Sequence, residues 1–144
     1  MAKRWKIQGL GFDMSKKDFH ACLAGITEQG AFKIVAQRKF ANTPKGFARL
    51  VEWLENKRKD KTVALQIVLE VTGVYHEGLL YHLHDLGYQI SLQLAKRTKR
   101  YLEAIGHKSK TDKLDGRGLA QMACERQLKP WQPLTQYILE LRTL

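Results

Sequence analysis

The sequence predicts an α/β fold in which three antiparallel strands are followed by alternating helices and strands. The first 40 residues contain three strand-like segments joined by short connections. Short connections favour antiparallel neighbours, because a parallel step needs a crossover of about a dozen residues or more. Beyond residue 42, segments with helical periodicity alternate with apolar segments typical of buried strands.

The strand-like segments are rich in apolar residues and are separated by polar turns or by glycine. The three opening strands are expected at residues 6–13, 18–27 and 31–40. Residues 62–71 form a nearly unbroken apolar segment, as in a strand that is covered on both faces. A fifth strand is expected at residues 88–94.

The first helix is expected to begin at Asn42-Thr43-Pro44, which offers an N-cap and a proline for the first turn. Apolar residues at helical spacing then give it one buried stripe: Phe47, Leu50, Val51 and Leu54. Further helices are expected at residues 75–86, 96–105 and 112–127, and a final helical stretch at 134–144. The order βββ–α–β–α–β–α–α describes a ribonuclease H-like α/β fold.

A length of 144 residues suits one domain with its own core. We expect this domain to cover residues 1–129. Residues 130–144 are expected to begin a helical linker to a further C-terminal domain, because their apolar pattern continues to Leu144 without a capping residue.

The charge of the chain predicts a polyanionic partner. The net charge is +11, while the apolar fraction of 44% and the charged fraction of 27% are ordinary for a globular protein. Residues 1–40 and residues 96–117 each carry eight basic and three acidic side chains. We therefore expect the protein to bind nucleic acid, with DNA as the partner. Lysines that only keep the protein soluble are the alternative.

The two cysteines and the absence of long apolar segments predict the compartment. Cys22 and Cys124 lie far apart and match no metal-binding spacing. The sequence has no signal peptide and no apolar run near ~20 residues. These features predict a soluble cytoplasmic protein that does not enter a membrane.

Four acidic residues form the candidate metal site. Asp13 and Glu70 lie at or near the ends of two apolar strands, and Asp112 and Asp115 are three residues apart on a predicted helix. Carboxylates are the ligands that Mg²⁺ prefers, and paired divalent ions serve phosphodiester chemistry. We expect all four to be catalytic metal ligands for Mg²⁺, with Mn²⁺ as a substitute. Four unrelated, solvated acids are the alternative.

Basic residues near these acids are candidate nucleic-acid contacts: Lys16, Lys17, Lys96, Arg97, Lys99, Arg100, Lys110 and Lys113. The segment Lys96–Tyr101 mixes cations with an aromatic ring, a composition that suits a phosphate backbone or RNA. A solvated helix face is the alternative. The turn Val71-Thr72-Gly73 either admits a phosphate or simply joins a strand to a helix.

Five short motifs then occur in a specific order along the chain: Gly11-Phe12-Asp13-Met14-Ser15-Lys16, Asn42-Thr43-Pro44-Lys45-Gly46-Phe47, Glu70-Val71-Thr72-Gly73-Val74-Tyr75, Lys110-Thr111-Asp112-Lys113-Leu114-Asp115 and Trp131-Gln132-Pro133. As a set they resemble the N-terminal domain of DEDD-type transposases of the IS110 insertion-sequence family, relatives of the Piv DNA invertases. Two departures are Leu94-Ala95, where Asn-Pro is frequent, and Gly116, where alanine is common.

The resemblance implies a RuvC-like nuclease fold and a Mg²⁺-dependent DNA recombinase that cleaves and transfers DNA strands. It places the acidic tetrad of the family on Asp13, Glu70, Asp112 and Asp115. It also implies a structured guide RNA as a second partner, and we expect a homo-oligomer in the full-length protein. In the family a C-terminal domain carries a nucleophilic serine, for which these 144 residues have no room.

Three other functions stay open from the residues alone. A stand-alone Holliday-junction nuclease would use the same acids. A non-catalytic nucleic-acid-binding domain would use only the basic segments. An ATP-binding domain of the actin-like type also opens with a glycine-rich strand and an aspartate, but it gives no reason for the pair Asp112 and Asp115.

Overall fold

A computed structural model of the chain describes residues 4–71, 73–106 and 112–133, and for residues 112–115 the backbone alone. It contains nine elements in the predicted order: β1 (Trp5–Met14), β2 (Asp18–Thr27), β3 (Phe32–Ala41), α1 (Pro44–Lys57), β4 (Leu65–Val71), α2 (Glu77–Asp85), β5 (Ile90–Leu94), α3 (Ala95–Ala104) and α4 (Asp112–Glu125). The predicted helical stretch at 134–144 lies outside the described residues.

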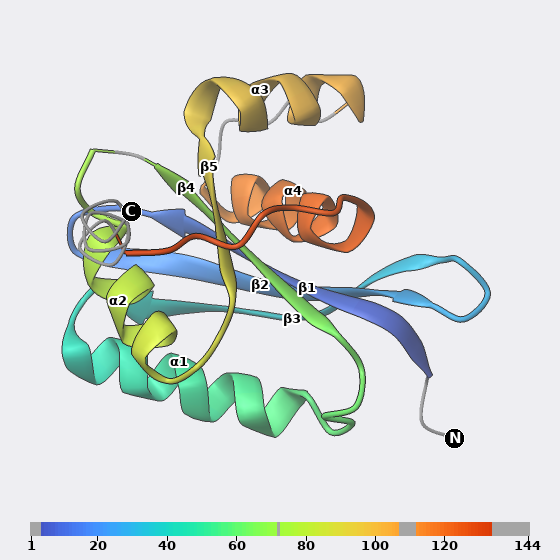
Figure 1. The fold of residues 1–144 in the computed structure, drawn as a ribbon, viewed down its shortest axis with the longest axis horizontal. Helices are drawn as coiled ribbons and strands as arrows, with labels where there is room; N and C mark the ends of the chain where they lie inside the picture. Colours follow the sequence, from blue (N-terminus) through green and yellow to red (C-terminus); the bar gives the residue numbers. More distant parts are fainter. Residues whose placement is uncertain (1–3, 72, 107–111, 134–144) are drawn as a thin grey trace, which may run out of the picture.

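The strands form one mixed sheet in the order β3-β2-β1-β4-β5 (Figure 1). The pairs β1–β2 and β2–β3 are antiparallel, which confirms the predicted meander. The pairs β1–β4 and β4–β5 are parallel. The carboxyl ends of β1, β4 and β5 therefore meet at one edge of the sheet, where ligands of open α/β sheets commonly bind.

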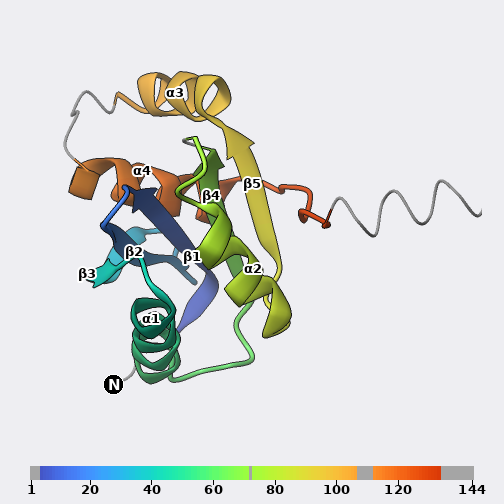
Figure 2. The ribbon, with the colours of Figure 1, turned by 90° about the vertical axis from the view of Figure 1, so that its left-hand side faces the viewer.

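Helices cover both faces of the sheet (Figure 2). On one face, α1 and α2 pack Phe47, Leu50 and Leu83 against strand residues such as Phe12 and Leu69. On the other face, α4 and α3 pack on the sheet through a second, smaller cluster that includes Val68, Tyr101 and Leu119. Within the part of the chain that is described, no helix is long and apolar enough to span a membrane.

Helix α4 lies directly on the backbone of β1. A Cβ atom added to Gly11 would come within 2.3 Å of the Ala120 backbone nitrogen, and one added to Gly9 within 2.5 Å of the Ala120 carbonyl oxygen. Glycine at these two positions permits a separation that no larger residue allows. The separation matters because α4 carries the predicted ligands Asp112 and Asp115 in its first turn.

Helix α1 begins as the sequence predicts. Thr43 is the N-cap, and its hydroxyl accepts a hydrogen bond of 3.1 Å from the Gly46 backbone nitrogen. The apolar stripe is buried at Phe47, Leu50 and Leu54, while Val51 is partly buried against the same core. A cap of this kind is worth about 1 kcal/mol, so most of the stability of the helix comes from its buried face.

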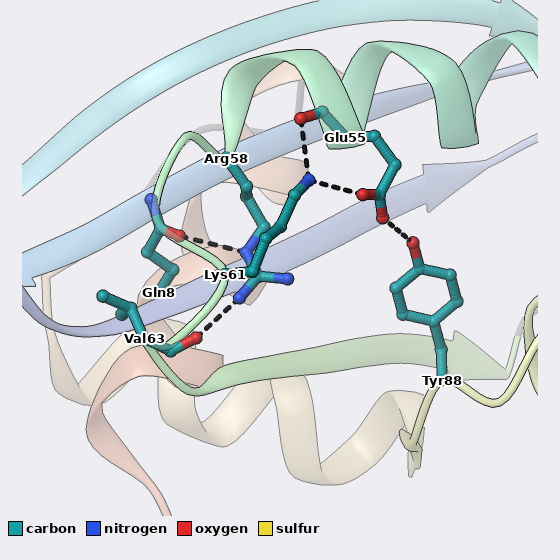
Figure 3. Close-up of polar contacts among 6 residues, drawn as sticks. All are labelled: Gln8, Glu55, Arg58, Lys61, Val63 and Tyr88. Atoms are coloured by element: carbon teal, nitrogen blue, oxygen red, sulfur yellow. Dashed lines mark hydrogen bonds and ion pairs between the residues drawn. The ribbon is translucent and has the colours of Figure 1, made fainter.

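A polar cluster fixes the end of α1 to the sheet (Figure 3). Arg58 is only 8% exposed. Its Nε donates to the side-chain oxygen of Gln8 at 3.1 Å, and a terminal nitrogen donates to the Val63 carbonyl at 2.6 Å. Glu55 accepts hydrogen bonds from Lys61 and from the Tyr88 hydroxyl, and the Lys61 bond contributes most to lowering the Glu55 pKa. These contacts lie near the start of β4, at the sheet edge opposite to the carboxyl ends of the parallel strands.

The segment after α4 returns along the sheet. Trp131 donates its backbone N–H to the Ile90 carbonyl at 2.7 Å, and its ring packs edge-on against Tyr81 and His84. Residues up to 133 therefore contact the body of the domain, and the boundary between residues 129 and 130 stays a prediction.

Candidate functional site

Asp13 and Glu70 are neighbours at the carboxyl ends of two adjacent parallel strands. The last paired residues of β1 and β4 are Phe12 and Leu69, and the two acids follow them directly. Phe12 and Leu69 point into the core under α1 and α2. Because side chains alternate along a strand, Asp13 and Glu70 point to the α4 face. Both residues are partly exposed, although the Oδ2 atom of Asp13 is buried.

Glu70 has a partner from α3. The hydroxyl of Thr98 donates a hydrogen bond to Glu70 Oε2, and Thr98 is fully buried. The same hydroxyl lies 3.0 Å from the Ala95 carbonyl oxygen. One hydroxyl proton serves one acceptor at a time, and a bond to a charged carboxylate is the stronger of the two. Thr98 therefore orients one carboxylate oxygen of Glu70.

The first turn of α4 lies beside Asp13. A Cβ atom added to Gly116 would be 3.9 Å from the Asp13 backbone nitrogen and 3.7 Å from the His20 carbonyl oxygen. Asp112 and Asp115 precede Gly116 in the same helix. The backbone thus brings both elements to the same edge of the sheet, while the side chains of Asp112 and Asp115 lie outside the description.

Asp13 and Glu70 would form part of the ligand set of a divalent metal ion. Asp13 and Glu70 supply carboxylate oxygens, the hard ligands that Mg²⁺ prefers. Among the side chains that the structure describes, no three histidine, cysteine or acidic groups form a cluster. The predicted ligands Asp112 and Asp115 fall outside the side chains that the structure describes.

The two cysteines pack together between β2 and α4. Cys22 of β2 and Cys124 of α4 are both free and buried. Burial raises the pKa of each thiol to about 12. Since the thiolate is the reactive form, this burial disfavours a nucleophilic role for either cysteine.

Asn42 joins the loops that follow the two acidic strands. Its side-chain amide donates to the carbonyl oxygens of Ser15 and Tyr75, at 2.9 Å each. Ser15 lies just beyond Asp13, and Tyr75 follows the turn after Glu70. In that turn Gly73 adopts a φ of 63°, which glycine takes freely.

We expect Asn42→Ala to lower the free energy of unfolding by about 1–2 kcal/mol, because two backbone carbonyls lose their donor. Urea denaturation followed by circular dichroism measures this change. Thr43→Ser is the matched control, because serine retains the N-cap. An unchanged stability in Asn42→Ala would show that water replaces the amide at no cost.

The predicted nucleic-acid contacts fall into two exposed groups. Lys16 and Lys17 lie in the turn between β1 and β2, just after Asp13. Lys96, Arg97, Lys99 and Arg100 are exposed on α3. Lys110 lies outside the described residues, and of Lys113 only the backbone is described, in α4.

The sequence did not reveal the roles that four residues play around this site: Gly9, Gly11, Asn42 and Thr98. The alternation Gly9-x-Gly11 was an available signal, because glycines on one face of a strand mark a close approach. Thr98 was the only uncharged residue in the run 96–100, a weaker signal of an inward face.

The comparison with protein families decides the assignment. The family profile described as Transposase, that of the IS110-type DEDD transposases, matches residues 10–144. The chain belongs to this family. The match extends over all five motifs of the sequence analysis and confirms the resemblance.

Curated relatives agree with the family. The chain is 28% identical over 136 residues to the pilin gene-inverting protein of Moraxella bovis and 27% identical to that of Moraxella lacunata. Each match covers 94% of this chain and 40% of the relative. The chain thus spans well under half the length of these relatives.

Solved structures confirm the RuvC-like fold. Thermus thermophilus RuvC superposes with a TM-score of 0.59 at 14% identity, covering 87% of this chain and all of that chain. The fowlpox virus Holliday junction resolvase gives a TM-score of 0.50 at 13% identity, covering 81% of this chain and 94% of that chain. At such identities the likeness establishes the fold alone.

Proposed function

We propose that this chain is the N-terminal catalytic domain of a DNA transposase or site-specific recombinase that cleaves and transfers DNA strands with Mg²⁺. The observation that carries the proposal is the placement of Asp13 and Glu70 side by side at the strand ends, beside the first turn of α4. Family membership and the pilin gene-inverting relatives support DNA as the substrate.

In this proposal Asp13, Glu70, Asp112 and Asp115 hold one or two divalent ions. Such ions would supply charge neutralisation at the attacking and leaving oxygens of a phosphodiester. Thr98 holds the Glu70 carboxylate in one orientation, and Asn42 holds the two loops that flank the acids. Lys16, Lys17 and the exposed cations of α3 would bind the sugar-phosphate backbone.

The finer parts of the proposal come from the family resemblance. A structured guide RNA is proposed as a second partner, and a homo-oligomer as the state of the full-length protein. Residues 1–129 are proposed to fold as the nuclease domain and to act together with a C-terminal domain that supplies a serine nucleophile. We therefore expect residues 1–144 to bind DNA in a salt-dependent way without completing strand exchange.

A crystal of the chain soaked in Mn²⁺ tests the metal site, because Mn²⁺ gives an anomalous signal that locates it. We expect the strongest anomalous peak to lie between the carboxylates of Asp13 and Glu70. Competition with excess Mg²⁺ should weaken that peak, since both ions accept oxygen ligands. Mn²⁺ bound only at other acids, such as Glu52 or Asp60, would overturn the assignment.

A further inference from the structure

A cationic groove lies between α3 and α4, on the face of the sheet that also carries the acidic pair. It encloses a cavity of about 280 Å³. Six residues line it: Arg97, Arg100, Tyr101, Ala104, Met122 and Arg126. We call this surface the α3–α4 groove. Its lining residues come from α3, from α4 and from the residue after α4. Figures 1 and 2 both show α3 above α4.

Three arginines gather at the groove: Arg97 and Arg100 from α3, and Arg126 directly after the end of α4. Arg97, Arg100 and Arg126 are all exposed. Among the described residues, none of the three arginines forms a direct ion pair with a carboxylate. The Glu125 carboxylate accepts a hydrogen bond from the hydroxyl of Tyr101, whose ring Arg126 contacts. Three guanidinium groups around one hollow repel each other, and an anion placed between them would relieve that repulsion.

The buried ring of Tyr101 forms the floor of the groove. Tyr101 is 6% exposed, and its hydroxyl donates to Glu125. The guanidinium carbon of Arg126 lies 5.3 Å from the centre of the Tyr101 ring. The ring therefore holds Arg126 in place by a cation–π contact. Because Arg126 covers it, the ring cannot stack on an unpaired base, which is how single-stranded RNA is commonly read.

We propose that the α3–α4 groove binds the phosphate backbone of duplex DNA. Planar guanidinium groups match phosphate oxygens with paired hydrogen bonds. The groove is separate from the acidic pair, because Thr98 contacts Glu70 from the buried side of α3 while Arg97 and Arg100 face the hollow. The inference rests on the proposed function, which takes DNA as the ligand and the exposed cations of α3 as backbone contacts, and it adds Arg126 and the groove between α3 and α4.

In a simpler interpretation the arginine stems cover apolar atoms of α3 and α4 while their charged heads stay hydrated. That reading explains one or two arginines over Met122 and Ala104. It does not explain an open hollow with three cations around it and no described acid among its lining residues. The two interpretations differ in the salt dependence of DNA binding. Only arginines that contact phosphate contribute to the slope of log K against log salt.

The test measures the affinity of the 144-residue chain for a labelled duplex of about 20 base pairs by fluorescence anisotropy. The titrations are made in EDTA at KCl concentrations from about 50 to about 300 mM, which is a useful range for salt slopes. We expect the double variant Arg97→Gln/Arg126→Gln to bind at least about 10-fold more weakly at 100 mM KCl. The slope of log K against log salt should fall by about 2, since each phosphate contact contributes about 0.9. EDTA removes metal from the measurement, so failure here leaves the Mn²⁺ test of the acids untouched.

Lys45→Gln/Arg49→Gln is the matched control. It removes the same charge from exposed positions of α1, on the opposite face of the sheet. We expect it to change the slope by less than about 0.5. Arg97→Lys/Arg126→Lys keeps the charge and should retain the slope, and thermal melting confirms that each variant is folded. A hairpin RNA of similar length is titrated as a second probe. Equal weakening of duplex binding by both glutamine pairs would overturn the proposal, as would a loss of affinity for the RNA alone.

Discussion

Gly11→Ala is expected to destabilise the fold by about 3 kcal/mol or more. The added Cβ would lie 2.3 Å from the Ala120 nitrogen, 2.6 Å from the Gly116 carbonyl oxygen and 2.7 Å from the Leu119 carbonyl carbon. All three are backbone atoms of α4, so no side-chain rotation relieves the clash. Overpacking of this kind commonly costs 1–3 kcal/mol, and here a whole helix must move (about 3 or more). Urea denaturation followed by circular dichroism measures the loss.

Gly116→Ala is the control for that experiment. Its Cβ would have neighbours at 3.7 and 3.9 Å, which are ordinary contacts. Alanine is favoured over glycine in a helix by about 1 kcal/mol, so this variant should be as stable as the parent chain or slightly more stable. Glycine at position 116, where alanine is common in the family, therefore lowers the stability only slightly. Similar stabilities for the Gly11 and Gly116 variants would contradict the close packing of α4.

The fold could be predicted because its signals are local. Short connections at residues 15–17 and 28–31 leave only an antiparallel meander for the first three strands. The cap at Thr43 and the stripe behind it define α1 without reference to any other element. The unbroken apolar run of β4 indicates a central strand, and the structure places it between β1 and β5.

The contacts of the site depend on how elements pack, and local signals do not contain that information. The sequence indicates Asp13 and Glu70 as candidates because they lie at or near the ends of two apolar strands. Their adjacency depends on the parallel register of Phe12 with Leu69, which only the assembled sheet defines. Arg126 gave no signal at all, because its importance comes from Tyr101 of another helix.

Glu70→Gln is expected to abolish metal binding at the site, with a loss of affinity of at least about 100-fold for Mn²⁺. The amide keeps the shape of the side chain but removes its charge, and neutral amides are poorer ligands than carboxylates for hard cations. Mn²⁺ titration followed by electron paramagnetic resonance measures the loss in the 144-residue chain. Glu52→Gln, an exposed acid of α1, is the matched control and should leave the affinity unchanged.

Thr98→Val tests whether the affinity depends on the orientation of Glu70 as well as on its charge. Valine keeps the volume of the buried side chain but removes the hydroxyl that donates to Glu70 Oε2. Partners of metal ligands typically contribute 10–100-fold in affinity, so we expect about a 10-fold loss. Thr98→Ser retains the hydroxyl and should restore the affinity. If the role of Thr98 were purely structural, both variants would be less stable than the parent chain, and Thr98→Ser would lose more stability because serine leaves the larger gap in the core. Their Mn²⁺ affinities would then not differ in favour of serine. Equal affinities for Thr98→Val and Thr98→Ser would therefore mean that the hydroxyl does not position Glu70.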